Sequence, residues 1–204
     1  MPKGFSEREK EIIHQRLLEE GRKTFSAYGL KKTNIEDLTR AAGISKGAFY
    51  LFYESKEDLF MDVAEEAERQ FRQVVLQAVE APGPTPRARL TSVLKTAFTI
   101  WKTTPILQMV QQEDYRQLLM RLPPEKVQEH LASDRQFITV LMERCRQCGI
   151  PFQADMLHTA MLMNALFFVS LHEEDFGPDV YPATIDLMID LTAAYCLGEV
   201  PPAV

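Results

Sequence analysis

The sequence predicts an all-α protein of about nine helices. Apolar residues recur at helical spacing along the chain, and no segment alternates apolar and polar residues for long, as a half-buried strand would. Residues 82–87 hold three prolines and one glycine, so the helical pattern is broken most clearly there. Hydrophobic residues make up 46% of the 204 residues, which is enough to bury a large core.

The first helix is expected over residues 7–28. Ser6 is followed three residues later by Glu9, which fits a capping box at the helix start. Gly29 can end the helix because glycine accepts the left-handed conformation of many helix ends. The apolar stripe of this helix consists of Ile13, Leu17, Leu18, Gly21, Phe25 and Tyr28.

Two short helices joined by a tight turn are expected over residues 34–53, and together they make a helix-turn-helix. Asn34 and Ser45 are suited to cap the two helices, and Gly43 stands where the chain must turn. The expected core of this motif, with the first helix beneath it, is Leu17, Phe25, Leu38, Ala42, Ile44, Phe49 and Tyr53.

A long helix is expected over residues 56–81, capped by Ser55 with Asp58 at the box position. We therefore divide the chain into a helix-turn-helix domain, residues 1–60, and a second domain, residues 61–204, with the long helix linking them. Further helical patterns lie at residues 87–103, 105–121, 124–148, 154–173 and 180–197.

The net charge of −6 is distributed unevenly along the chain. Residues 1–56 carry eleven Lys and Arg against eight Asp and Glu, a balance of +3, and the remainder carries −9. A basic amino-terminal part favours an anionic partner. Three cysteines, no apolar signal segment and no run of about eighteen apolar residues favour a cytoplasmic protein without a membrane span.

The second helix of the motif carries residues that a core does not need. Lys46 and Gly47 stand at its amino end, the end that enters the major groove in this motif. Tyr50 points away from the packed face, where its hydroxyl can contact a phosphate. Lys56 begins the next helix, and Thr33 and Asn34 begin the first motif helix, so they too are placed to contact phosphates. This pattern indicates double-stranded DNA as the partner.

Residues 17–60 contain several motif elements at characteristic spacings. They are Phe25, Gly29 and Thr33; Ala42, Gly43, Ser45 and Gly47; Phe49 and Tyr50; Tyr53; and Ser55, Lys56 and Glu57. In these elements the segment resembles the amino-terminal domain of the tetracycline-repressor (TetR) family of bacterial transcriptional regulators. The resemblance implies DNA contacts by Thr33, Ser45, Lys46, Gly47, Ala48, Tyr50, Leu51 and Lys56. Leu51 and Phe52 depart from the His or Tyr often found there in the family, and Leu51 can contact a thymine methyl but cannot donate to a phosphate.

The same resemblance implies a homodimer on a roughly palindromic operator, with a carboxy-terminal domain that binds a small effector. Methionines and aromatic residues suggest a largely apolar, lipophilic effector, although a methionine or aromatic residue at helical spacing is more often plain core. The candidate effector residues are Phe98, Trp101, Met109, Gln112, Tyr115, Phe137, Met163 and Phe167. The candidate dimer residues, on two strongly apolar helices that could instead form an intramolecular core, are Leu162, Leu166, Val169, Met188, Leu191 and Tyr195.

The cysteines and the remaining sequence patterns do not indicate a catalytic site. Cys145 and Cys148 share a helix face, but a redox or zinc role would need a second pair of ligands. The candidates for that pair are Cys196 with His130 or His158. No Ser/His/Asp spacing or phosphate-cradling glycine loop occurs, so we expect no enzyme, cofactor or metal. We predict a ligand-responsive regulator, acting as a repressor. The alternatives are a helical lipid carrier or enzyme without DNA binding, and a protein-interaction adaptor.

Overall fold

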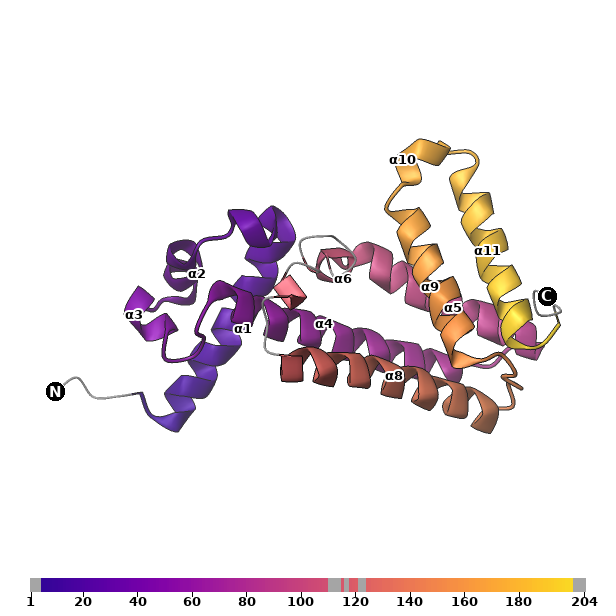
Figure 1. The fold of residues 1–204 in the computed structure, drawn as a ribbon, viewed down its shortest axis with the longest axis horizontal. Helices are drawn as coiled ribbons and strands as arrows, with labels where there is room; N and C mark the ends of the chain where they lie inside the picture. Colours follow the sequence, from indigo (N-terminus) through magenta and orange to yellow (C-terminus); the bar gives the residue numbers. More distant parts are fainter. Residues whose placement is uncertain (1–4, 110–114, 116–117, 121–123, 200–204) are drawn as a thin grey trace. The chain divides into compact units, whose positions relative to one another are not determined.

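Every regular element described by the computed structural model is a helix (Figure 1). The structure describes residues 5–109, 115, 118–120 and 124–199, and within them it contains ten helices. The helices are α1 (Glu7–Lys32), α2 (Ile35–Ala42), α3 (Lys46–Phe49), α4 (Lys56–Val79), α5 (Pro86–Thr103), α6 (Pro105–Met109), α8 (Pro124–Gln147), α9 (Met156–Ser170), α10 (Glu173–Phe176) and α11 (Tyr181–Cys196). The all-α prediction is confirmed, with the short α10 as an element that the sequence pattern did not indicate.

The chain folds into two compact units. The amino-terminal unit comprises Met1–Glu68 and Pro105–Met120, and the carboxy-terminal unit comprises Arg69–Thr104 and Arg121–Val204. Helix α4 therefore contributes residues to both units, and α6 returns to complete the first unit. The predicted division of the chain into domains at residue 60 stays a prediction.

The caps predicted for the amino-terminal unit are present. The Ser6 hydroxyl accepts the N–H of Glu9 at 3.3 Å, and the Glu9 carboxylate accepts the N–H of Ser6 at 2.8 Å, which is a complete capping box. Asn34 caps α2 by accepting the N–H of Asp37, and Ser45 caps α3 by accepting the N–H of Ala48. Gly29 leaves the helical conformation, with φ 77° and ψ 167°, but the chain resumes a helical turn to Lys32, so Gly29 makes a kink rather than an end.

The core of the amino-terminal unit is built from the helix-turn-helix and the helices that support it. Phe25 packs edge-on against Phe60, with ring centroids 5.2 Å apart. Of the seven residues predicted for this core, six are buried and Ile44 is half-buried. The buried six are Leu17, Phe25, Leu38, Ala42, Phe49 and Tyr53.

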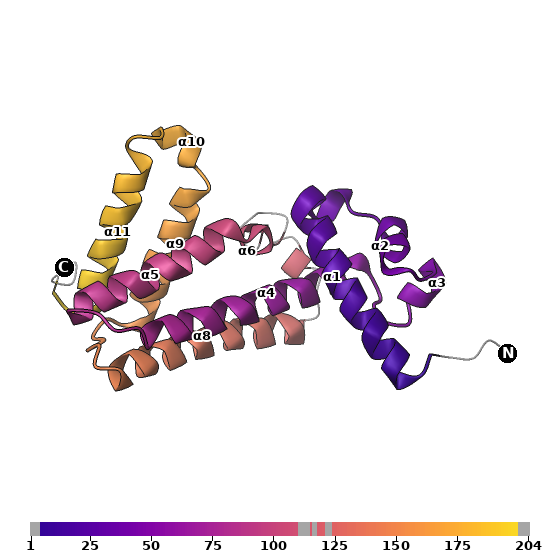
Figure 2. The ribbon, with the colours of Figure 1, turned by 180° about the vertical axis from the view of Figure 1, so that it is seen from behind.

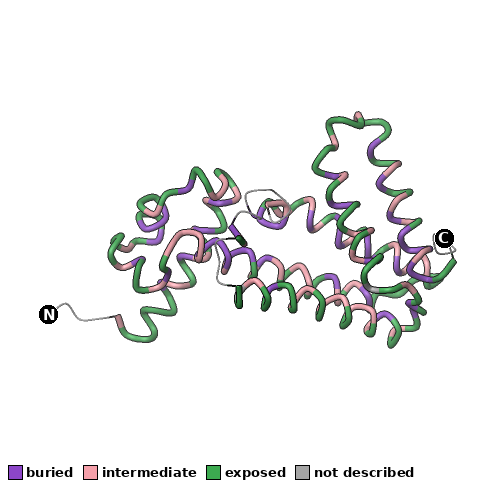
Figure 3. Tube along the Cα trace, in the orientation of Figure 1, coloured by how far each residue is buried: buried purple, intermediate pink, exposed green. Residues whose placement is uncertain are grey.

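In the carboxy-terminal unit, α5 contacts both α9 and α11, and α8 contacts α9. Helices α9 and α11 run side by side in both views, with α10 in the connection between them (Figures 1 and 2). Buried and exposed positions alternate along both helices (Figure 3). Each helix thus covers the unit with one face and leaves apolar residues exposed on the other.

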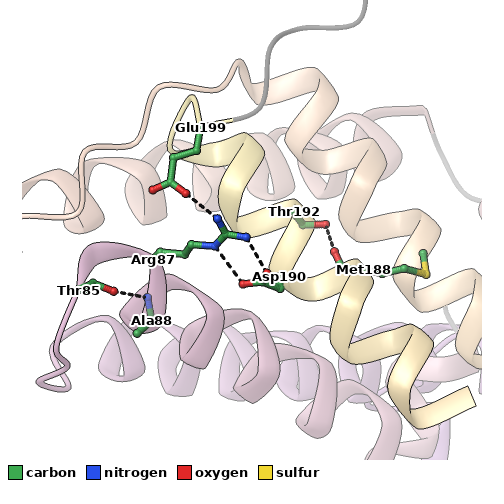
Figure 4. A network of polar contacts seen from close by, with 7 residues as sticks. All are labelled: Thr85, Arg87, Ala88, Met188, Asp190, Thr192 and Glu199. Atoms are coloured by element: carbon green, nitrogen blue, oxygen red, sulfur yellow. Dashed lines mark hydrogen bonds and ion pairs between the residues drawn. The ribbon is translucent and has the colours of Figure 1, made fainter.

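Two arginines near the start of α5 hold this unit together. Arg87 donates from Nε and Nη2 to the two carboxylate oxygens of Asp190 in α11, at 3.1 and 2.6 Å, and from Nη1 to Glu199 at 2.9 Å (Figure 4). This two-pronged contact fixes the orientation of the guanidinium as well as its position. Arg89 donates to three backbone carbonyls, those of Val79 at 3.0 Å, Ala81 at 3.2 Å and Cys148 at 2.6 Å.

Candidate nucleic-acid interface

Helix α3 separates its residues into a packed side and an exposed side. Gly43, with φ 73°, turns the chain so that α3 can pack against α2. Phe49 is 0% exposed and Tyr53, just beyond the helix, is 6% exposed. Lys46 and Gly47 are exposed at the amino end of α3, and the Tyr50 side chain that follows is exposed as well. A β-carbon added to Gly47 would come no closer than 3.9 Å to another side chain, so its surroundings are open.

The neighbouring candidates Ala48 and Leu51 are placed differently from each other. Ala48 is half-buried, and its backbone N–H is bound by the Ser45 hydroxyl at 3.1 Å. Leu51 is 73% exposed, a high value for a leucine side chain. The exposure of Leu51 is compatible with an apolar contact to a base, and that contact stays a prediction.

Lys46 forms an ion pair with Glu36, a pairing that the sequence did not indicate. Its ammonium donates to Oε1 of Glu36, near the start of α2, at 2.5 Å. The bond raises the pKa of the Lys46 ammonium and lowers the pKa of the Glu36 carboxyl, since it stabilises the charged form of both groups. Both side chains are about half exposed. The ion pair therefore lies on the surface and joins the two helices of the motif.

Thr33 and Asn34 connect α1 to α2, and their side chains have different roles. Thr33 is only 3% exposed, and its hydroxyl donates to the carbonyl of Gly29 at 2.8 Å, so its side chain is used within the fold. Asn34 is exposed, its Oδ1 accepts the N–H of Asp37 at 2.8 Å, and its Nδ2 donates to Asp37 at 2.6 Å. Asn34 is thus the member of this pair whose side chain lies at the surface.

The Lys56 ammonium is directed into the amino-terminal unit. It donates to the carbonyl of Leu30 at 2.9 Å and to that of Thr33 at 2.7 Å, and it lies 3.4 Å from the carbonyl of Lys31. These carbonyls belong to the end of α1, where backbone acceptors lack helical partners. Lys56 therefore braces the corner between α1 and α2 in this structure, and its predicted contact with a phosphate stays a prediction.

A polar cluster behind the exposed face was missed in the sequence. The Tyr53 hydroxyl donates to Oδ2 of Asp62 at 3.0 Å, and Nε2 of His14 lies 3.7 Å from the same oxygen. The His14 ring also stacks on Tyr53, with centroids 5.8 Å apart. Burial raises the pKa of the Tyr53 hydroxyl far above its usual range, helped by the charge of Asp62. This cluster joins α1, the end of the helix-turn-helix and α4.

The candidate effector residues are divided between the two compact units. Trp101 and Phe167 are buried in the carboxy-terminal unit with their rings stacked, 4.7 Å between centroids. Phe98 is buried in that unit, and Phe137 and Met163 are half-buried. The two described candidates in the amino-terminal unit are Met109, half-buried, and Tyr115, buried beside Phe60. Gln112 lies outside the described residues.

The candidate dimer residues lie on α9 and α11. Leu166 is 1% exposed and belongs to the core of its own unit, whereas Leu191 is 50% exposed. The other four candidates, Leu162, Val169, Met188 and Tyr195, are half-buried. Four further exposed apolar residues on the same two helices were missed in the sequence: Leu157, Met161, Phe168 and Leu187. Three of them lie on α9, where apolar residues on more than one face hide which side is exposed.

The three cysteines are free thiols. Cys145 and Cys196 are buried, and Cys148 at the end of α8 is half-buried. Burial raises the pKa of the Cys145 and Cys196 thiols to about 11. In the part of the chain that the structure describes, no helix is both long and apolar enough to cross a membrane.

Comparison with known proteins places the amino-terminal segment in a family. Residues 17–63 match the model of "Bacterial regulatory proteins, tetR family". The chain is 26% identical over 118 residues to the HTH-type transcriptional regulator AcrR of Shigella flexneri, covering 57% of this chain and 50% of that protein. It is 31% identical over 78 residues to the HTH-type transcriptional repressor DhaR of Mycobacterium sp. (strain GP1), covering 38% of this chain and 39% of that protein. The chain thus spans half or less of the length of these curated relatives.

Solved structures share the fold over nearly the whole chain. The fatty acid degradation regulator FadR from Bacillus halodurans matches with a TM-score of 0.63 and 14% identity, covering 98% of this chain and 99% of that chain. FadR from Bacillus subtilis in complex with stearoyl-CoA matches with a TM-score of 0.63 and 16% identity, covering 89% of this chain and 98% of that chain. With its helix-turn-helix in place, the segment of residues 17–63 is similar, in sequence and in fold, to the amino-terminal part of the tetR family of bacterial regulatory proteins.

Proposed function

We propose that this protein is a DNA-binding transcriptional regulator, and that it acts as a repressor. The observation that carries the proposal is the division of α3: Phe49 and Tyr53 are buried, while Lys46, Gly47 and Tyr50 are exposed at and after its amino end. A short helix with this division can insert its exposed side into a major groove. Because a bacterial operator lies in the cytoplasm, the proposal also locates the protein there.

The proposed active form is a homodimer on a palindromic operator. Support comes from the exposed apolar residues of α9 and α11, where Leu157 is 67% exposed, Phe168 61% and Leu187 59%. Apolar residues gathered on two adjacent helices are typical of a protein interface. Pairing these helices with the same helices of a second copy would bury them around a two-fold axis.

The proposed effector is a small, largely apolar molecule bound in the carboxy-terminal unit. The stacked rings of Trp101 and Phe167 and the methionine-rich helices support an apolar ligand. FadR from Bacillus subtilis, which shares the fold, was solved with stearoyl-CoA, so a fatty acyl compound is the first class to test. Effector binding would favour a form of the dimer that fits the operator badly, and the protein would release DNA.

The test of DNA binding is a selection of bound sequences from a random duplex pool, followed by anisotropy titration of the enriched duplex at a fixed salt concentration. We expect a palindromic sequence to be enriched. Lys46→Ala/Tyr50→Ala should lower the affinity at least about tenfold, as loss of base and phosphate contacts does. The lipid carrier, enzyme and adaptor alternatives predict that no sequence is enriched, and that result would overturn the proposal.

A matched control variant distinguishes the loss of DNA contacts from the mere loss of one positive charge and one aromatic ring. Lys10 is bound to Glu7 and its side chain is 51% exposed, the same exposed fraction as the Lys46 side chain. Tyr28 on α1 is 65% exposed, against 51% for Tyr50. Lys10→Ala/Tyr28→Ala therefore removes the same charge and a ring that is also largely exposed, both outside the proposed interface, and it should leave the affinity nearly unchanged.

Effector binding can be followed through the single tryptophan of the sequence, Trp101. Stearoyl-CoA or stearate should change the fluorescence of Trp101. The same compound should lower the affinity for the selected duplex, because binding near Trp101 is proposed to release DNA. A fluorescence change without DNA release would contradict the coupling, and no change with either compound would exclude this class of effector.

A further inference from the structure

An ion pair connects the two helices of the helix-turn-helix on its exposed side. Glu36 is the second residue of α2, Lys46 is the first residue of α3, and Nζ of Lys46 lies 2.5 Å from Oε1 of Glu36. The side chains are 54% and 51% exposed, so both can be reached by a macromolecule. Tyr50 stands one turn beyond Lys46 and is also exposed.

We propose that Glu36 is a positioning residue that holds the Lys46 ammonium away from DNA phosphates and thereby increases the preference for the operator over other DNA. This inference rests on the DNA-binding function proposed above. It adds a specificity-determining role for an acidic residue that is not itself expected to contact DNA.

The reason lies in the different chemistry of phosphates and base edges. Phosphate contacts are the same for every sequence, and they supply nearly all of the affinity for non-specific DNA. An ammonium has three N–H donors, so Lys46 can keep its bond to Glu36 while it donates to an acceptor on a base edge. A move of Lys46 to a phosphate would instead separate the ion pair and leave the Glu36 carboxylate facing the negative backbone. Glu36 therefore disfavours the non-specific complex more than the operator complex.

The adjacent carboxylate provides a closely matched comparison. Asp37 follows Glu36 in the first turn of α2, and its charge is paired with Arg40 at 3.0 Å rather than with Lys46. It also accepts a hydrogen bond from Asn34 at 2.6 Å. Glu36→Gln and Asp37→Asn thus change the net charge equally at neighbouring positions, but only the first releases Lys46.

The experiment measures the affinity of each variant for the selected duplex and for a scrambled duplex over a series of salt concentrations. Glu36→Gln should raise the affinity for the scrambled duplex about three- to tenfold. The slope of log affinity against log salt concentration should become steeper by about 0.9, as expected for one added phosphate contact. Affinity for the selected duplex should change less, so the ratio of the two affinities falls. Asp37→Asn should change both duplexes alike.

The same substitution in a Lys46→Ala background tests the mechanism. Without the ammonium, Glu36→Gln should have no larger effect on the scrambled duplex than Asp37→Asn has. Equal effects of Glu36→Gln and Asp37→Asn in the wild-type background, or an effect of Glu36→Gln that persists without Lys46, would overturn the role of Glu36. If the unchanged protein binds neither duplex, the proposed function itself fails, and that outcome is distinct from selective binding that does not respond to Glu36. Thermal melting of every variant confirms that it is folded.

Discussion

The hydroxyl of Tyr53 donates a hydrogen bond to the Asp62 carboxylate at 3.0 Å, which connects the end of the helix-turn-helix with α4. Tyr53 is only 6% exposed and its ring also contacts Phe49, at 5.8 Å between centroids. The position of α3 therefore depends on a partly buried polar contact as well as on apolar packing.

Tyr53→Phe should lower the free energy of unfolding by about 1–2 kcal/mol, because it removes a hydrogen bond to a charged acceptor while keeping the ring. Urea denaturation followed by circular dichroism measures this change. Tyr28→Phe, at a largely exposed tyrosine, is the control and should be neutral. Equal stabilities of Tyr53→Phe and the unchanged protein would show that the bond contributes nothing.

Lys56→Met should lower the free energy of unfolding by about 1–3 kcal/mol, because the carbonyls of Leu30 and Thr33 lose a charged donor. Methionine keeps most of the apolar stem, so packing is largely retained. Urea denaturation gives the value, and Lys10→Met serves as the exposed control. A variant that keeps full stability but loses DNA affinity would contradict the bracing role and favour a direct phosphate contact.

Arg89→Ala should be among the more destabilising single changes in the carboxy-terminal unit, costing about 2–4 kcal/mol. The guanidinium donates to the carbonyls of Val79, Ala81 and Cys148, and its removal leaves these acceptors without that donor. The measurement is the urea midpoint together with the m-value. Arg89→Lys should recover only part of the lost stability, because a lysine cannot reach three acceptors with the same fork geometry. Full recovery would contradict the role of the guanidinium in binding all three carbonyls.

One of the three thiols should react quickly in the folded protein at about pH 8, and that thiol is Cys148. Burial raises the pKa of Cys145 and Cys196 to about 11, so both stay protonated and shielded. Since the folded pKa lies above the unfolded value, the stability that these two thiols contribute is complete below about pH 9 and is lost as the pH rises toward 11. Titration with a thiol-reactive chromophore, with Cys148→Ser as control, counts the reactive groups; rapid reaction of all three would contradict the burial.

Local features of the fold could be predicted because they depend on residues close together in sequence. The capping residues Ser6, Asn34 and Ser45 and the turn at Gly43 are of this kind, and the structure confirms them. Burial of Phe49 and Tyr53 followed from helical spacing, and it is confirmed as well.

The contacts between residues distant in sequence could not be predicted in the same way. Lys46 binds Glu36 ten positions earlier, and Lys56 reaches carbonyls more than twenty positions earlier, so both pairings depend on how the helices turn back on one another. Helix α9 presents a different difficulty, because apolar residues surround it and no stripe in the sequence distinguishes buried Leu166 from exposed Leu157.

The amino-terminal unit is assembled from two separate stretches of the chain, and this has a consequence for its synthesis. Ile106, Tyr115 and Leu118 are all buried, and Tyr115 lies against Phe60 with ring centroids 6.2 Å apart. A nascent chain that has emerged only as far as Glu68 lacks these side chains, so it still exposes apolar surface that they will cover. The amino-terminal unit should therefore reach its final stability on the ribosome only after residue 120 has emerged, and a fragment cut at Glu68 should aggregate more readily than the whole protein.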